Sequence, residues 1–138
     1  MKEGKVSRSP RFDELLSEAK KARANAYAPY SRYAVGAALL GSDGRVYAGC
    51  NMENASYGAT ICAERGALAA MIASGCRQWS LCVVVTDDGG TPCGVCRQAM
   101  HEFATADAEV VSLDESGNAQ TFKMTELLPH AFRLRREP

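Results

Sequence analysis

The chain lacks an excess of charge of either sign. Its 138 residues include 16 Lys and Arg and 16 Asp and Glu, so the formal net charge is zero. Proteins that bind polyanions normally carry a large positive field. The balance of charge therefore argues against a nucleic-acid partner, and against an enzyme that edits tRNA or DNA.

Long hydrophobic runs are also missing. No uninterrupted apolar stretch reaches the roughly 20 residues that cross a bilayer, and the first ten residues lack the apolar segment of an export signal. We therefore expect a cytoplasmic protein with no membrane partner. Because no repeat or composition shift divides the chain, we expect one domain over residues 1–138, with flexible tails at about 1–9 and 133–138.

Six cysteines stand out against this ordinary composition. Without an export signal, a disulfide framework is disfavoured, and closely spaced cysteines indicate metal ligands or catalytic groups. Three of the six have no such spacing. We expect Cys50, Cys76 and Cys82 to be small buried apolar residues.

Hydrophobic periodicity and turn residues predict the order α-β-β-α-β-α-β-β, followed by a short tail. The expected helices cover residues 10–22, 61–73 and 93–103, and the expected strands cover 33–40, 45–50, 81–85, 109–113 and 119–123. The apolar run 81–85 is typical of a central strand that is covered on both faces. Strands that alternate with helices in this way predict one mixed sheet flanked by helices.

The candidate metal ligands are Cys62, Cys93 and Cys96. Cys93 and Cys96 are three residues apart at the predicted start of a helix, so both thiols can lie on one face and chelate one ion. Cys62 opens another predicted helix, and helix N-termini favour the thiolate that zinc requires. Three protein ligands leave the fourth tetrahedral position of a catalytic zinc free for water.

Glu64 is the candidate proton shuttle. It lies two residues after Cys62, and such neighbours on a regular helix point to nearly opposite sides. We therefore place Cys62 at the helix cap, so that the longer Glu64 side chain reaches the metal-bound water. A carboxylate there accepts a proton from water and passes it to a leaving group.

Two arginines are candidates for charge compensation. Three thiolates and one dication leave a net charge of minus one, which opposes deprotonation of the water. Arg65 and Arg97 each directly follow a site residue, and a guanidinium that donates to thiolate sulfur would offset this charge. The alternative is that both arginines make surface or helix-end contacts.

The pattern Cys-x-Glu followed by Pro-Cys-x-x-Cys is typical of zinc deaminases, in which His often replaces the first Cys. The chain resembles the small zinc-dependent cytidine deaminases of the homotetrameric class over about residues 12–132. The motifs that carry this likeness are AYAPYSRYAVGAAL, CNMENASYGATICAERGAL, PCGVCRQ and LLPHAF, which begin at residues 26, 50, 92 and 127.

The resemblance implies a cytidine-deaminase-like three-layer α/β/α sandwich around a five-stranded mixed sheet, with one Zn²⁺ per subunit. It implies that zinc-bound hydroxide attacks the ring carbon that carries the amine of cytidine, and of deoxycytidine, in pyrimidine salvage. Glu64 would protonate the adjacent ring nitrogen and then the departing ammonia. The family is usually tetrameric, and neighbouring subunits complete each active site.

The resemblance also assigns substrate contacts. Asn51 and Glu53 would bind the ribose hydroxyls, and Tyr33 occupies a position where the family commonly has Phe to stack on the pyrimidine. From a neighbouring subunit, Ala55 and Tyr57 would approach the 5′ end of the sugar. Phe132 would cover the base in the same way.

Two other functions stay open. Blasticidin S deaminases share the fold and the zinc pattern, although the Asn-Met-Glu-Asn segment and the Arg after Glu64 resemble the nucleoside enzymes. The second alternative is a binding protein with a structural zinc, but such sites normally have four protein ligands. His101 and His130 lie at helical and tail positions where packing or surface roles are expected.

Overall fold

The computed structural model describes residues 9–134, so most of the tails expected at about 1–9 and 133–138 lies outside the described residues. The helices are α1 (Phe12–Arg23), the short 3-10 helix η1 (Tyr57–Ala59), α2 (Ala63–Ala73), α3 (Gly94–Phe103) and α4 (Met124–Leu127). The strands are β1 (Gly36–Gly41), β2 (Val46–Cys50), β3 (Trp79–Val85), β4 (Ala104–Leu113) and β5 (Ala119–Lys123). Within the described residues, no helix has both the length and the apolar character needed to span a membrane.

The five strands form one mixed sheet in the order β2-β1-β3-β4-β5. β1 pairs antiparallel with β2 and with β3, β3 pairs parallel with β4, and β4 pairs antiparallel with β5. The parallel pair is joined through α3, as parallel strands require a crossover connection. The predicted mixed sheet is confirmed.

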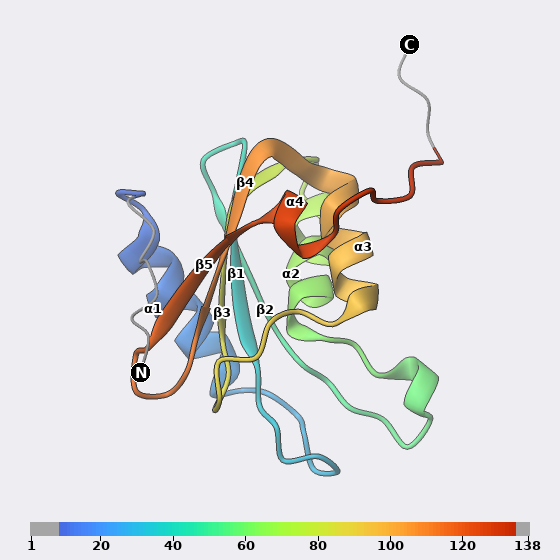
Figure 1. Cartoon of the computed structure of the whole chain (residues 1–138). Coiled ribbons are helices and arrows are strands. Elements are labelled where there is room, and N and C mark those ends of the chain that lie inside the picture. The colour runs from blue at the N-terminus through green and yellow to red at the C-terminus, as the bar shows by residue number, and fades with distance from the viewer. Residues whose placement is uncertain (1–8, 135–138) are drawn as a thin grey trace.

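Helices cover both faces of this sheet, with α1 on one face and α2 and α3 on the other (Figure 1). The side chains of β3 alternate between the two sides. Leu81, Val83 and Val85 pack in the core beneath α1, whereas Cys82 and Val84 pack in the core beneath α2 and α3. This alternation confirms the three-layer α/β/α sandwich, and it confirms β3 as a central strand covered on both faces.

Two glycines let helices approach the sheet closely. A Cβ added at Gly36 would lie 2.0 Å from the carbonyl oxygen of Ala19, so α1 packs directly on the backbone of β1. A Cβ added at Gly49 would lie 2.5 Å from the amide nitrogen of Ala67, so α2 packs in the same way on β2. The backbones of both helices are therefore in direct contact with the backbone of the sheet.

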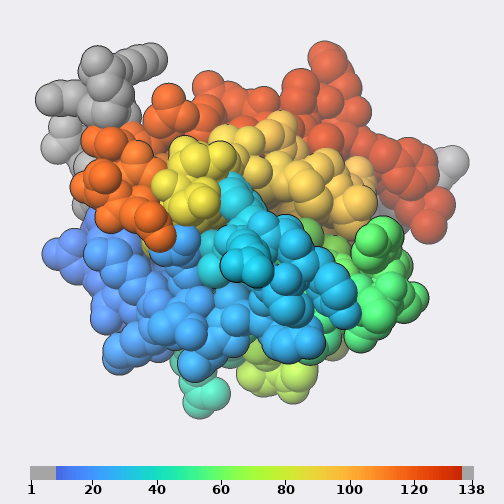
Figure 2. Space-filling view, turned by 90° about the horizontal axis from the view of Figure 1, so that it is seen from below, coloured from blue at the N-terminus to red at the C-terminus, as the bar shows by residue number. Residues whose placement is uncertain are grey.

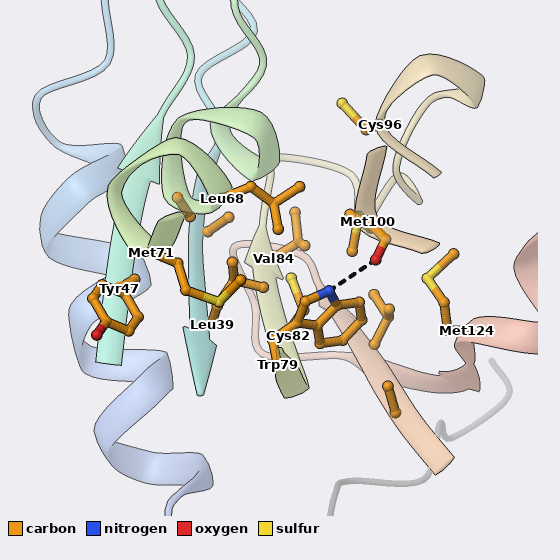
Figure 3. Close-up of a cluster of buried hydrophobic side chains, with 14 of the residues drawn as sticks. Leu39, Tyr47, Leu68, Met71, Trp79, Cys82, Val84, Cys96, Met100 and Met124 are labelled. Carbon is orange, nitrogen blue, oxygen red and sulfur yellow. Dashed lines mark hydrogen bonds between the residues drawn. The ribbon is translucent and has the colours of Figure 1, made fainter. Parts of the chain in front are cut away.

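A buried indole joins the central strand to the third helix. Trp79 is fully buried at the start of β3, and its Nε1 donates a hydrogen bond of 2.9 Å to the carbonyl oxygen of Met100 in α3 (Figure 3). A buried indole N–H requires such a partner. The bond fixes α3 relative to the sheet.

Several element boundaries differ from the sequence prediction. β1 begins at Gly36 rather than at residue 33, because the carbonyl of Tyr33 and the amide of Val35 bind the side chain of Asn51 instead of a neighbouring strand. α1 begins at Phe12 rather than at residue 10, and its N-cap is Arg11. β4 is longer than expected and begins at residue 104, directly after α3.

The three cysteines outside the motifs also differ from one another. Cys76 and Cys82 are buried in the core beneath α2 and α3, as expected. Cys50 is only partly buried, because it lies at the end of β2, where the strand passes into the loop before α2. The expectation of a buried residue was therefore wrong for Cys50.

Candidate metal centre and substrate cavity

Most of the predicted site residues gather at one end of the sheet, where the segment before β1, the loop between β2 and α2, and the loop between β3 and α3 come together (Figure 1). Figure 2 looks onto this end, where the yellow loop after β3 lies against the cyan segment before β1. A cavity of about 440 Å³ opens here. Its lining residues are Ser31, Tyr33, Val35, Asn51, Glu53, Thr60, Cys62, Ala63, Glu64, Thr86, Gly90, Thr91 and Cys93.

The three candidate ligands come from two helix starts. Cys62 is the N-cap of α2 and Cys93 is the N-cap of α3, and both have extended backbone there. Cys96 lies in the first turn of α3 and is buried. The three Sγ atoms lie within 4.8 Å of one another, and those of Cys62 and Cys93 are 4.0 Å apart. The predicted cap position of Cys62 is confirmed.

This donor set fits zinc. Thiol sulfurs are preferred zinc ligands, and a catalytic zinc needs three protein ligands with one position left open. Within residues 9–134, these three cysteines are the group of His, Cys, Asp or Glu whose ligand atoms converge in this way. Cys62 and Cys93 also line the cavity, so a metal held by them would be next to bound substrate.

Hydrogen bonds make the thiol of Cys62 acidic. Donation from the thiol of Cys96, together with smaller contributions from Arg65 and Cys93, lowers the pKa of Cys62 to about 5, although partial burial acts in the opposite direction. The Nη2 atom of Arg65 lies 3.6 Å from Sγ of Cys62 and also donates to the carbonyl of Thr60. The same shared proton raises the pKa of Cys96. These bonds favour the thiolate form of Cys62, which is the form that binds zinc.

Glu64 is buried in the wall of the cavity with 4% of its surface exposed. Burial is the largest cause that raises the pKa of Glu64 to about 7, and the nearby charge of Cys62 adds to this effect, whereas Arg65 opposes it. A carboxyl group with a pKa near neutrality both accepts and donates a proton readily. The position and the acidity of Glu64 suit a general acid and base.

Arg97 makes a different set of bonds from the one expected. Its Nε donates to the carbonyl of Pro92 at 2.7 Å, its Nη1 to the carbonyl of Leu127 at 2.9 Å, and its Nη2 to Oγ1 of Thr91 at 2.7 Å. Direct donation to a thiolate is not among these bonds. The guanidinium therefore holds the segment just before Cys93 against the last residue of α4.

Asn51 and Glu53 organise the loop that precedes β1. The buried amide of Asn51 accepts from the backbone of Val35 at 2.9 Å and donates to the carbonyl of Tyr33 at 2.7 Å. The carboxylate of Glu53 accepts from the amides of Tyr30 and Ser31 and from the hydroxyl of Ser31, and these bonds lower the pKa of Glu53. Both side chains line the cavity, where free lone pairs of Glu53 can face a substrate.

Three of the expected substrate contacts lie away from this cavity. Ala55, Tyr57 and Phe132 are exposed, and the two aromatic side chains have 84% and 66% of their surface accessible. None of the three lines the cavity of this subunit. His101 and His130 are not part of the thiol cluster.

Sequence reasoning missed part of the cavity wall. Ser31, Thr60, Thr86 and Thr91 line it but were not singled out. One signal was available for Thr86, because a polar residue that directly follows a buried apolar strand lies at the end of the sheet where ligands bind. Thr60 and Thr91 precede the ligand-bearing helices, which also hinted at their position.

Comparisons with known proteins agree with this site. A family model described as "Cytidine and deoxycytidylate deaminase zinc-binding region" matches residues 11–112. The chain is 49% identical over 120 residues to a cytidine deaminase of Halalkalibacterium halodurans, which covers 86% of this chain and 91% of the relative. It is 43% identical over 122 residues to one of Sporosarcina psychrophila, with 87% and 90% covered.

Solved structures are similar as well. The crystal structure of cytidine deaminase from Burkholderia pseudomallei superposes with a TM-score of 0.82 at 44% identity, and the match covers 92% of this chain and 100% of that one. The structure of cytidine deaminase from Mycobacterium tuberculosis gives a TM-score of 0.79 at 38% identity, with 91% and 100% covered.

Proposed function

The chain belongs to the cytidine and deoxycytidylate deaminase family, and from this premise we propose that it hydrolyses cytidine, and deoxycytidine, to the corresponding uracil nucleoside and ammonia. One observation carries the proposal. Three thiols that converge within 4.8 Å and a buried glutamate with a pKa of about 7 lie together at the cavity. A metal site beside a carboxyl group with a pKa near neutrality suits hydrolysis of the bond between a ring carbon and its amino group.

Cys62, Cys93 and Cys96 would hold the zinc ion, which when bound supplies a Lewis acid that lowers the pKa of water toward about 7. Glu64 accepts one proton from the attacking water and delivers it to N3 of the pyrimidine. It then carries the second water proton to the amino group on C4. The C4–N bond breaks, and ammonia leaves with the proton that Glu64 has supplied.

Arg65 supports this chemistry by its position. The three thiolates carry more negative charge than one dication neutralises, and excess negative charge opposes deprotonation of water. A guanidinium 3.6 Å from the sulfur of Cys62 offsets part of that charge. Hydrogen bonding to Cys62 and Cys96 raises the pKa of Arg65, so the side chain stays charged.

The cavity wall favours a nucleoside over a nucleotide. Its described lining residues include the carboxylates Glu53 and Glu64 but neither lysine nor arginine. A 5′-phosphate would find no cationic partner in this wall, whereas Glu53 can accept from sugar hydroxyls and Asn51 retains one free N–H. Tyr33 offers an aromatic face to the base.

Neighbouring subunits would complete the site in a homotetramer. Tyr57 and Phe132 are large aromatic side chains that this subunit leaves exposed, and exposed aromatics of this kind typically mark interfaces. Ala55 lies in the same exposed loop as Tyr57. We place the enzyme in the cytoplasm, where a reducing environment keeps the ligand thiols available, in the salvage of pyrimidine nucleosides.

The direct test is the loss of cytidine absorbance, with ammonia measured in parallel, on addition of purified protein. We expect turnover that a zinc chelator abolishes and added zinc restores. Blasticidin S serves as the competing substrate. If the protein deaminated only blasticidin S, the substrate assignment would be wrong, and if neither compound reacted while zinc stayed bound, a structural zinc site would be the better interpretation.

A further inference from the structure

The hydroxyl of Tyr33 donates a hydrogen bond of 2.7 Å to Oδ1 of Asp88. Tyr33 lies before β1, and Asp88 lies in the loop that joins β3 to α3. Tyr33 lines the cavity from one side, and Gly90 and Thr91 of the Asp88 loop line it from the other. This side-chain bond therefore connects two walls of the cavity, through residues that are 55 positions apart in sequence.

The Asp88 loop is organised around this bond. Oδ1 of Asp88 also accepts from the amide of Gly90 at 3.0 Å and from Oγ1 of Thr86 at 3.3 Å. Oγ1 of Thr86, which is buried, in turn accepts from the amides of Gly89 and Gly90. These bonds make the turn a connected unit, so the bond to Tyr33 positions the whole turn.

The other end of the bond reaches the residues that we expect to hold the sugar. The carbonyl of Tyr33 accepts from the side chain of Asn51 at 2.7 Å. The amide of Tyr33 donates to Oγ of Ser31 at 3.0 Å, and that hydroxyl donates to Glu53. Movement of Tyr33 would therefore disturb both Asn51 and Glu53, the expected contacts of the sugar.

Gly90 is fitted to the tyrosine hydroxyl. A Cβ added at Gly90 would lie 2.7 Å from the hydroxyl oxygen of Tyr33 and 3.3 Å from Oδ1 of Asp88, but 3.9 Å from the ring carbon Cζ. The φ angle of Gly90 is not positive, so backbone conformation does not require glycine here. Glycine is required because the Tyr33 hydroxyl occupies the space that a Cβ would take.

We propose that the Tyr33 hydroxyl and the Asp88 carboxylate form a latch across the cavity, and that this latch positions the aromatic ring and the Gly90 turn to bind the nucleoside. The inference rests on the proposed deamination. Tyr33 and Asp88 are positioning residues for substrate binding, because the thiols and Glu64 are held separately by α2 and α3. The latch should therefore affect KM more than kcat.

The first test measures KM and kcat for cytidine with the zinc-loaded full-length protein. Tyr33→Phe and Asp88→Ala should each raise KM about 3- to 10-fold, the effect expected for one charge-assisted bond at a partly exposed site, while kcat changes less than about twofold. The double variant should be no worse than either single variant. Asp88→Asn keeps an acceptor for the hydroxyl and should restore most of the affinity.

The second test uses Gly90. Gly90→Ala places a methyl group against the hydroxyl and should raise KM by about tenfold or more. In the Tyr33→Phe background, Gly90→Ala should raise KM much less, because the hydroxyl oxygen that the new methyl group meets at 2.7 Å is absent. This rescue distinguishes the latch from a general loss of stability.

The matched control is Tyr47→Phe. The hydroxyl of Tyr47 also donates to a carboxylate, that of Asp43, but in the hairpin between β1 and β2 and away from the cavity. Its removal should leave KM unchanged, even where it lowers the melting temperature. Unchanged KM for Tyr33→Phe and Asp88→Ala, or equal effects of Gly90→Ala in both backgrounds, would overturn the latch. Absence of cytidine turnover by the unmodified protein would instead overturn the proposed function.

Discussion

The Nη2 atom of Arg65 lies 3.6 Å from Sγ of Cys62, and both residues stand at the start of the same helix. The helix that supplies a ligand therefore supplies the positive charge beside it as well. The free N–H groups at that helix end add to the same field. Charge compensation is thus built into the segment that carries the ligand.

Arg65→Gln should weaken the metal site. Loss of the guanidinium removes one of the interactions that lower the pKa of Cys62, so the thiolate becomes harder to form. We expect a fall of about 10- to 100-fold in zinc affinity or in kcat/KM, as is typical for groups that support metal ligands. Competition with a chromophoric chelator measures the affinity. Arg77→Gln, at an exposed position, is the control and should change neither quantity.

Glu64→Gln should abolish most of the activity while zinc stays bound. The amide preserves the shape of the side chain but cannot carry the proton, and such a shuttle contributes about 10²- to 10⁴-fold in rate. Metal analysis and kcat for cytidine on the same sample make the measurement. Glu102→Gln, on the exposed side of α3, should behave like the unmodified protein. Full activity of Glu64→Gln would contradict the proposed role of Glu64 in proton transfer.

Glu64 should also make the stability of the metal-free protein depend on pH. Burial raises its pKa from 4.5 to about 7, so between these values the unfolded state has released a proton that the folded state retains. The stabilising effect of this neutral carboxyl is complete below about pH 4.5 and is lost as the pH rises toward 7. Glu64→Gln should therefore become more stable relative to the parent by about 3 kcal/mol over this range. Urea unfolding at several pH values checks this. A difference in the free energy of unfolding between variant and parent that does not change with pH would contradict it.

Removal of the metal should lower both activity and thermal stability. The ligands come from the starts of two different helices, so a bound ion joins α2 to α3 in the folded state. At a free concentration 1,000-fold above its dissociation constant, a ligand specific for the folded state stabilises it by about 4 kcal/mol. Calorimetry with chelator and after readdition of zinc provides the measurement. A chelated protein with unchanged melting temperature and turnover would exclude this role.

Gly36→Ala should destabilise the fold without a specific effect on chemistry. The added methyl group would lie 2.0 Å from the carbonyl oxygen of Ala19 and 2.7 Å from the amide nitrogen of Arg23, and both of these are backbone atoms of α1. We expect a loss of about 3 kcal/mol or more in the free energy of unfolding. Gly58→Ala is the control, because its added methyl group meets no atom within 4 Å. Denaturant unfolding of the two variants tests the contrast.

The sequence predicted much of this architecture because its strongest patterns are local. The apolar run 81–85 identified the central strand, and the spacing of Cys93 and Cys96 identified a chelating helix start. The cap position of Cys62 followed from the need to reconcile it with Glu64. Each of these features depends on neighbours in the chain, which periodicity and capping rules describe.

Several other long-range contacts were not predicted, because nothing in the local sequence around either partner indicates them. Nothing near Arg97 indicates that the carbonyl of Leu127, 30 residues away, will accept from its guanidinium instead of a thiolate. The late start of β1, at Gly36 rather than at residue 33, likewise depends on the side chain of Asn51, which bonds the backbone of Tyr33 and Val35. The bond between Tyr33 and Asp88 joins two loops that only the folded sheet brings together.

The hydrogen bond between Trp79 and the carbonyl of Met100 has a spectroscopic consequence. The sequence contains one tryptophan, so the intrinsic fluorescence of the protein comes mainly from a single indole that is fully buried against α3. Any displacement of α3 from the sheet would admit water to this indole and shift its emission to longer wavelength. The emission of Trp79 therefore reports on the position of the helix that presents two of the three candidate metal ligands.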